Sequence, residues 1–231
     1  MTGPPPFLVG VVPAAGRSGR MGGSAKPLLD TGEGTFLERV VRALREGGAS
    51  AVVVGVREDP SPLAAHAREL GTRVLVPPGL EEGPIATLRA ALDGPSAEGP
   101  GGGDHGQAPD AILYLPADMP LVRPETVAAV VRGWAEEPES AHSSPPTRPT
   151  VVLPQWRGQT GHPALFAGSA LQDLLEPDLP EGARTVVEHH RAAGTLKTVP
   201  VEDRGTTVDI DTVPEYRRHF PRAFRKRFQK W

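Results

Sequence analysis

The stretch that decides the fold is FLVGVVPAAGRSGRMGGSAKP, residues 7–27. Its first six residues form an uninterrupted apolar run, which is typical of a strand buried on both faces. The rest is rich in small residues and contains the cations Arg17, Arg20 and Lys26. Small residues directly after a buried strand let backbone N–H groups approach an anion closely. We therefore interpret residues 13–27 as a phosphate-binding loop, with an ordinary surface loop as the alternative.

The remaining chain alternates between strand-like and helix-like stretches. Apolar runs with the length of strands lie at residues 51–56, 73–76, 111–115 and 150–153. Apolar residues at helical spacing lie at residues 35–45, 63–70, 85–92 and 125–134, and residues 184–193 also suggest a helix. This alternation predicts an α/β three-layer sandwich, a mostly parallel Rossmann-like sheet with helices on both faces. Ligands of such sheets bind beyond the carboxyl ends of the strands, so the segments that follow the strands are the place to look for chemistry.

A length of 231 residues predicts a single domain over residues 1–231. Gly, Pro, Ser and charged residues dominate residues 94–110 and 136–149, which we expect to be flexible loops. The chain has no cysteine, which excludes disulfides, cysteine-ligated metals and a cysteine nucleophile. No apolar run approaches the ~18 residues of a transmembrane segment, and no basic residue precedes the first apolar run. We expect a cytoplasmic protein.

Charge is distributed unevenly. Residues 216–231 hold seven Lys and Arg and no acidic residue, whereas the other residues hold 18 basic and 28 acidic side chains. The acidic body argues against nucleic acid as a partner. In the basic tail, Phe220, Phe224, Phe228 and Trp231 would form one aromatic stripe on a helix. We favour a terminal helix, starting near Pro221, that docks on the body; a protein or dimer contact and a membrane-surface segment are the alternatives.

Carboxylates stand where a metal site would need them. Asp118 follows the apolar run at residues 111–115, and Asp209 and Asp211 are two residues apart near the C-terminus. In a strand, Asp209 and Asp211 would point to one face. The structural alternative is that Asp118 caps a helix or turn and that one of Asp209 and Asp211 caps a helix beginning near Pro214. Thr212 is a further candidate for that second cap. Carboxylates beside a cationic loop are what a magnesium–triphosphate site needs.

Four motifs in this order resemble those of a known family. Residues 13–26 resemble a P-A-A-G-x-S-x-R-M-G…K signature, Asp118-Met119-Pro120 and residues 209–212 resemble metal-binding positions, and residues 161–166 and 182–184 resemble substrate-side segments. The chain is similar to the molybdenum cofactor cytidylyltransferase-like nucleotidyltransferases, which are related to molybdenum cofactor guanylyltransferases and methylerythritol phosphate cytidylyltransferase. The resemblance implies the nucleotide-diphospho-sugar transferase type of sheet and covers about residues 7–216.

The resemblance also implies roles for individual residues. An acceptor phosphate attacks the α-phosphorus of a nucleoside triphosphate and pyrophosphate leaves, which needs positioning and charge neutralisation rather than a protein nucleophile. The catalytic residues would be Arg20, Lys26 and Asp118. The nucleotide-binding residues would be Pro13, Ala14, Ala15, Gly16, Arg17, Ser18, Arg20, Lys26, Gly83 and Thr87. The acceptor would bind Gly161, His162 and Arg184, and the cofactor Mg²⁺ would bind Asp118 and Asp211, with Asp209 beside them.

The identity of the substrates depends on weaker signals. Ala15 stands where guanylyl-transferring relatives have Gly, and its methyl group favours CTP over GTP. Molybdopterin cofactor is the expected acceptor. The alternatives are a GTP-using enzyme, a transferase acting on a sugar or another small phosphate, and a non-catalytic nucleotide-binding regulatory protein. The adjacent His189 and His190 point about 100° apart on a helix, so we interpret them as part of a solvated helix face rather than a metal site.

Overall fold

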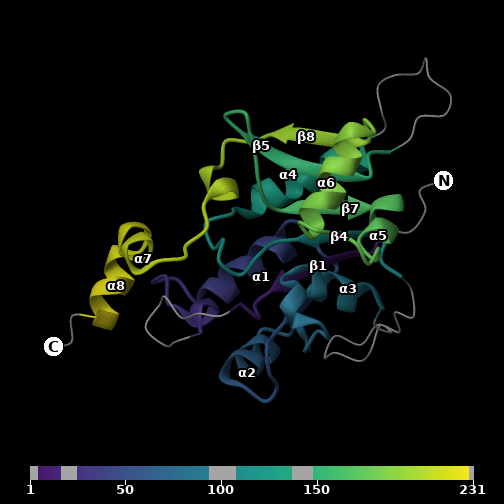
Figure 1. Ribbon diagram of the computed structural model, residues 1–231. Coiled ribbons are helices and arrows are strands. Elements are labelled where there is room, and N and C mark those ends of the chain that lie inside the picture. Colours follow the sequence, from purple (N-terminus) through teal and green to yellow (C-terminus); the bar gives the residue numbers. More distant parts are fainter. Residues whose placement is uncertain (1–4, 17–24, 94–107, 137–147, 229–231) are drawn as a thin grey trace.

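The computed structural model describes residues 5–16, 25–93, 108–136 and 148–228. It contains an eight-stranded sheet in which seven strands follow the order β3-β2-β1-β4-β7-β5-β6, while β8 pairs with β5 (Figure 1). The strands are β1 (Leu8–Pro13), β2 (Ala51–Gly55), β3 (Arg73–Leu75), β4 (Ala111–Tyr114), β5 (Val151–Trp156), β6 (Gln159–Thr160), β7 (Ala164–Ala167) and β8 (Leu196–Pro200). Most of the two expected loops, residues 94–107 and 137–147, lies outside the described residues.

The sheet is mostly parallel, as predicted. β1 pairs in parallel with β2 and β4, β2 with β3, and β5 with β8. β7 is antiparallel to both of its neighbours, β4 and β5. The reversal begins at the two-residue turn between β5 and β6, where Arg157 and Gly158 both have positive φ. Two consecutive positive φ values match a tight hairpin turn, so the chain returns beside β5 instead of crossing over.

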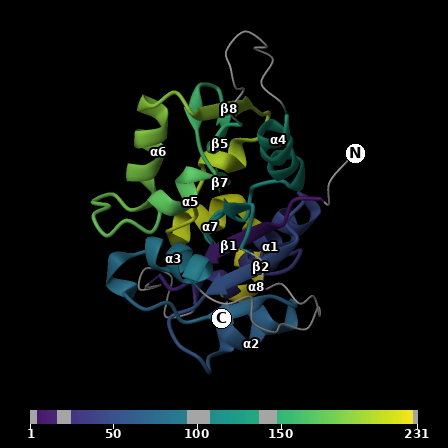
Figure 2. The ribbon, with the colours of Figure 1, turned by 90° about the vertical axis from the view of Figure 1, so that its right-hand side faces the viewer.

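Helices cover both faces of the sheet and give the predicted three layers, which Figure 2 shows from the side. On one face, α1 (Phe36–Glu46), α2 (Pro62–Glu69) and α4 (Pro124–Ala135) bury apolar side chains against the strands. On the other face, α3 (Ile85–Asp93), α5 (Ser169–Asp173) and α6 (Ala183–Ala192) do the same. The four helices predicted from apolar spacing, and the helix suggested at residues 184–193, are present to within one or two residues at each end.

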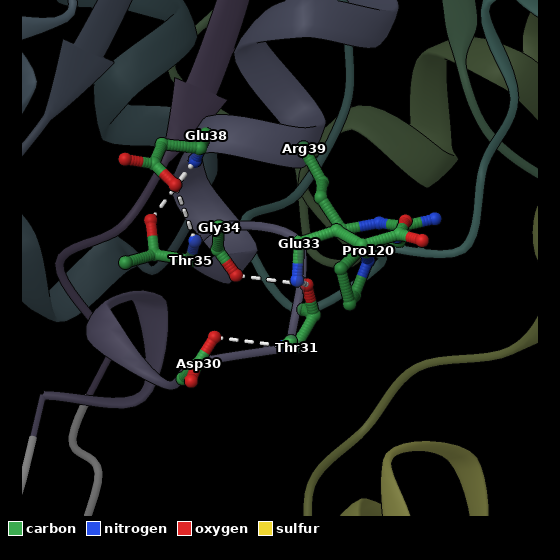
Figure 3. Close-up of polar contacts among 9 residues, drawn as sticks. Asp30, Thr31, Glu33, Gly34, Thr35, Glu38, Arg39 and Pro120 are labelled. Atoms are coloured by element: carbon green, nitrogen blue, oxygen red, sulfur yellow. Dashed lines mark hydrogen bonds and ion pairs between the residues drawn. The ribbon is translucent and has the colours of Figure 1, made fainter. Parts of the chain in front are cut away.

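A capped turn fixes the start of α1 (Figure 3). Thr35 is the N-cap: its hydroxyl accepts a hydrogen bond from the Glu38 N–H at 3.1 Å, and the Glu38 carboxylate accepts one from the Thr35 N–H at 2.6 Å. This reciprocal pair is a capping box. One turn later the Arg39 Nε donates to the Pro120 carbonyl at 2.9 Å. The helix is thereby tied to the loop that carries Asp118.

The C-terminal helices α7 (Val213–His219) and α8 (Pro221–Phe228) pack against the start of α1, in agreement with the predicted docked tail (Figure 1). The rings of Tyr216 and Phe220 lie 5.9 and 5.4 Å from the ring of Phe36. The terminal helix begins at Pro221, as predicted, so Phe220 lies before α8 rather than on it. The rings of Phe224 and Phe228 lie 4.8 Å apart on α8, but Phe228 is 40% exposed whereas Phe220 is buried. Trp231 lies outside the described residues.

Two other local predictions need correction. Residues 208–210 form no strand; they are a loop between the 3-10 turn Arg204–Thr207 and α7. His190 does not belong to a solvated face, because only 4% of it is exposed. Its Nε2 lies 2.8 Å from the Asp173 carboxylate and its Nδ1 lies 2.7 Å from the Thr150 hydroxyl. These partners, one just before β5 and one on α5, are distant in sequence and compensate the burial of this polar ring. His189 is exposed, as predicted.

No helix in the described part of the chain is long and apolar enough to cross a membrane.

Candidate active site

A pocket of about 1720 Å³ opens beyond the carboxyl ends of β1 and β4. These strands are parallel neighbours, and ligands of such folds bind beyond the carboxyl ends of the strands. Every predicted site residue that the structure describes lines this pocket: Pro13, Ala14, Ala15, Gly16, Lys26, Gly83, Thr87, Asp118, Gly161, His162, Arg184, Asp209 and Asp211. Arg17, Ser18 and Arg20 lie outside the described residues.

Lys26 joins two of the predicted metal ligands. Its Nζ lies 2.9 Å from the Asp118 carboxylate and 2.5 Å from the Asp211 carboxylate. Burial lowers the pKa of Lys26, but its hydrogen bond to Asp211 and the charge of Asp118 outweigh burial and raise the pKa above its ordinary value. The ammonium group is therefore firmly protonated, and it brings carboxylates 93 positions apart in the chain to a shared point.

Backbone contacts place these two carboxylates. Asp118 follows β4, and its carbonyl accepts a hydrogen bond from the Ile210 N–H at 2.9 Å. Asp211 is held by the start of α7, where the Glu215 carboxylate accepts from the Asp211 N–H at 2.9 Å and from the Thr212 N–H at 2.8 Å. Thr212 completes a capping box with Glu215, as the sequence suggested for this threonine. The cap of α7 therefore positions Asp211, which lines the pocket.

The carboxylates are suited to Mg²⁺ shared with a substrate. Burial first, then the charges of Asp211, Asp118 and Glu215, raise the pKa of Asp209, so this carboxylate lies within reach of the negative charges at this end of the pocket. Among the residues that the structure describes, no three acidic or histidine side chains are close enough to hold a metal by themselves. Mg²⁺ usually takes one or two carboxylates and completes its shell with water and substrate phosphates. The donor set fits that mode of binding.

His162 also lines the pocket, two residues before the start of β7. Its ring lies edge-on to Tyr114, with the ring centroids 5.0 Å apart. Its buried Nδ1 has no hydrogen-bond partner within the described structure. Burial lowers the pKa of His162, although a hydrogen bond with the Tyr114 backbone and the charge of Asp118 oppose this effect. His162 is therefore neutral near pH 7 and offers an unused polar atom beside the pocket.

Other predicted residues serve mainly to shape the walls. The side chain of Thr87 packs against Gly55, where an added Cβ would lie 2.5 Å from the Thr87 hydroxyl, and only 1% of Thr87 is exposed. A Cβ on Gly161 would lie 2.0 Å from the Thr206 carbonyl, so a glycine is needed for this close approach. Arg184 lies in the first turn of α6, with its Nε 3.2 Å from the Glu181 carboxylate.

The sequence analysis missed Arg57 and Tyr114, which also line the pocket. Arg57 follows β2, and its guanidinium donates to the Ala15 carbonyl at 2.6 Å. Tyr114 is the last residue of β4, and burial followed by the charge of Asp118 raises the pKa of its phenol. Arg57 could have been found by applying the strand-end rule to β2, because it is the first charged residue after that strand.

Comparison with known proteins defines the class. Residues 10–194 match the MobA-like NTP transferase domain, and the chain belongs to this family. It is 31% identical over 133 residues to a molybdenum cofactor guanylyltransferase of Nitrobacter hamburgensis, covering 57% of this chain and 58% of the relative. It is 28% identical over 154 residues to a probable molybdenum cofactor guanylyltransferase of Rhodopirellula baltica, covering 65% and 66%. The chain thus spans less than two thirds of the length of these curated relatives.

Solved structures share the fold. The crystal structure of Rv0371c from Mycobacterium tuberculosis superposes with a TM-score of 0.68 at 23% identity, over 94% of this chain and 98% of that one. A complex of Rv0371c with manganese gives a TM-score of 0.64 at 21% identity over the same shares. These likenesses support the predicted Rossmann-like sheet.

Proposed function

We propose that this protein is a nucleotidyltransferase that transfers a nucleoside monophosphate from a nucleoside triphosphate to a phosphate-bearing acceptor and releases pyrophosphate. The observation that carries the proposal is Lys26, whose Nζ contacts Asp118 and Asp211 in one pocket with the loop at residues 13–16. A cation and a pair of carboxylates beside a small-residue loop are the groups that a metal-bound triphosphate requires. Membership of the NTP transferase family supports this assignment.

The residues of the chain would act by binding and charge neutralisation. The backbone at residues 13–16 would cradle the nucleotide, because small residues allow a close approach. Lys26 would place a positive charge beside the phosphorus that is attacked, where negative charge builds up in the transition state. Asp118 and Asp211 would hold Mg²⁺, with Asp209 beside them, and the metal would supply charge neutralisation to the phosphates. The manganese complex of Rv0371c supports a divalent cation in this fold.

The acceptor would lie on the side of His162 and Arg184, across the pocket from the loop. The names of the two curated relatives favour a molybdopterin-type acceptor. A pocket of about 1720 Å³ has room for two substrates, since single ligands usually occupy roughly 300–1,000 Å³. The neutral His162 can donate or accept one hydrogen bond there, which suits a polar group on the acceptor.

For the donor we propose CTP, because the Cβ of Ala15 narrows the space beside the bound base. GTP is the second candidate, since both curated relatives are named guanylyltransferases. The direct test is pyrophosphate release measured with CTP, GTP, ATP and UTP, each with and without molybdopterin. Release that depends on both a triphosphate and the acceptor supports the proposal. A protein that binds these triphosphates without turnover would instead be a regulatory binder.

The same assay tests the carboxylates. Asp118→Ala should retain the fold and lose at least about a hundredfold in kcat, because removing one electrostatic contact to the transition state costs ~3 kcal/mol. Asp178→Ala, an acidic residue outside the pocket, is the control and should keep full activity. Full activity in Asp118→Ala with an unchanged circular dichroism spectrum would refute the assignment of this pocket as the active site.

A further inference from the structure

Arg57 connects two loops at the carboxyl edge of the sheet. β1 and β2 are parallel neighbours, with Pro13 opposite Gly55, so the segments that follow them emerge side by side. From its position after β2, the Arg57 guanidinium reaches across and donates to the Ala15 carbonyl at 2.6 Å. Both residues line the pocket. The side chain therefore lies against the loop that would cradle the donor nucleotide.

Arg57 differs from the other cations that line the described pocket in the group that its side chain contacts. Lys26 contacts Asp118 and Asp211. The remaining two also contact carboxylates of their own region: Arg184 with Glu181 and Arg191 with Glu188. Arg57 instead donates a hydrogen bond to the neutral carbonyl of Ala15. An exposed guanidinium held in this way keeps its full charge and most of its five N–H donors for a ligand.

The strand order indicates which part of a nucleotide Arg57 would meet. β2 and β4 lie on opposite sides of β1. Asp118, with Lys26 and Asp211, stands at the end of β4, so the triphosphate and its metal belong on that side. Arg57 stands at the end of β2, on the other side of the Ala14–Gly16 loop. A nucleotide laid across this loop directs its base, rather than its α-phosphate, toward Arg57.

We propose that Arg57 determines donor specificity by reading the hydrogen-bonding edge of the base; this inference rests on the proposed nucleotidyltransferase function. A guanidinium presents parallel donors that match two neighbouring acceptors. Guanine has such a pair in O6 and N7, and cytosine has one in O2 and N3. Adenine places an amino donor next to N7, which a guanidinium fork cannot satisfy. Arg57 therefore selects cytosine or guanine against adenine.

The experiment compares four proteins by calorimetric titration with CTP, GTP and ATP in the presence of Mg²⁺. Wild type should prefer CTP or GTP to ATP. Arg57→Ala should lose about tenfold in affinity for the preferred nucleotide and little for ATP, as expected for one bidentate contact. Arg57→Lys keeps the charge without the fork, so it should also lose the preference. Arg42→Ala, an exposed arginine on α1 outside the pocket, should bind as wild type does.

The outcomes separate this inference from the function on which it rests. If wild type prefers one base and Arg57→Ala keeps the same ratio of affinities, Arg57 does not read the base, although the nucleotidyltransferase assignment survives. An equal loss for all three nucleotides would likewise overturn the inference, because it would mean that Arg57 supplies only charge or support for the loop. A wild-type protein that binds all three equally would refute base reading, and one that binds none would refute the proposed function as well.

Discussion

At the scale of single residues, the buried His162 makes stability depend on pH. Burial lowers the pKa of His162 below the value of 6.5 expected in the unfolded chain. Below about pH 6.5 the unfolded chain therefore binds a proton that the folded protein does not, and stability falls as the pH falls. The loss can reach about 1.4 kcal/mol per pH unit for one proton.

Urea unfolding of wild type and His162→Gln at pH 7.5 and pH 5.0 measures this contribution. The free energy of unfolding of wild type should fall more steeply toward pH 5.0 than that of the variant. His219, whose pKa burial also lowers, titrates in both proteins and cancels in the comparison. Equal slopes in the two proteins would mean that His162 does not resist protonation in the folded state.

Ala15 provides a second residue-scale prediction, which concerns the donor base. Ala15→Gly removes a methyl group from the pocket wall and should admit a purine more easily. Overpacking typically costs ~1–3 kcal/mol, so kcat/KM for GTP relative to CTP should rise about tenfold or more. Both nucleotides are measured in wild type and variant under the same conditions. A wild type that prefers GTP, or an unchanged ratio in the variant, would favour GTP as the natural donor and reject the steric argument.

At the scale of elements, the cap of α7 should matter for activity as well as stability. Glu215 accepts hydrogen bonds from the backbone of Asp211 and Thr212, so it fixes one of the proposed metal ligands. Glu215→Ala should cost about 1 kcal/mol of stability, as losses of helix caps do. Because Asp211 loses its support, kcat should also fall by about tenfold. Glu215→Gln, which keeps an acceptor oxygen, should restore both.

The matched control for this cap is at the start of α1. Glu38 forms the same capping box with Thr35, but neither residue lines the pocket. Glu38→Ala should therefore lose a similar amount of thermal stability with kcat near the wild-type value. If Glu38→Ala and Glu215→Ala lose activity equally, the loss would reflect general destabilisation rather than the position of Asp211.

The helices and strands also show how much of the fold could be predicted from the sequence. Apolar runs and helical spacing predicted the buried strands and four helices, because these patterns follow directly from burial on one or two faces. They did not predict that β7 would insert antiparallel between β4 and β5, since this pairing depends on contacts between distant segments. The alternating pattern at Asp209 and Asp211 resembled a strand, yet the cap formed by Thr212 and Glu215 prevailed there.

The same limit applies to the site. The strand-end rule identified Lys26 and Asp118 because each follows a buried strand in a recognisable motif. Arg57 belongs to no recognisable motif. Its contact with Ala15 follows from the parallel pairing of β1 and β2. His190 was misjudged because its partners, Thr150 and Asp173, lie 40 and 17 positions away in sequence. Local periodicity contains no information about such partners.

At the scale of the whole molecule, the C-terminal helices α7 and α8 pack against the start of α1 and so connect it to the pocket. Tyr216 is fully buried, and its hydroxyl donates to the Asp30 carbonyl at 2.7 Å. Its ring and those of Phe36 and Phe220 form an apolar cluster with Ala223, separate from the two clusters beside the sheet. Phe224 of α8 packs against this cluster, with its ring 6.1 Å from that of Tyr216.

Removal of α8 should therefore weaken the fold more than the chemistry. A chain that ends at Phe220 loses Ala223 and Phe224 and exposes part of Phe36 and Tyr216. Burial of one large apolar side chain is worth roughly 1.5–3 kcal/mol, so a drop of several degrees in Tm is expected. Asp211 and its cap at the other end of α7 stay in place, so pyrophosphate release at a temperature well below Tm should remain within about threefold of wild type.

Arg222→Ala, an exposed change on α8, is the control and should leave Tm unchanged. An unchanged Tm in the truncated chain would show that the aromatic cluster does not depend on α8, whereas a loss of activity with a retained fold would assign the basic tail a direct part in the reaction.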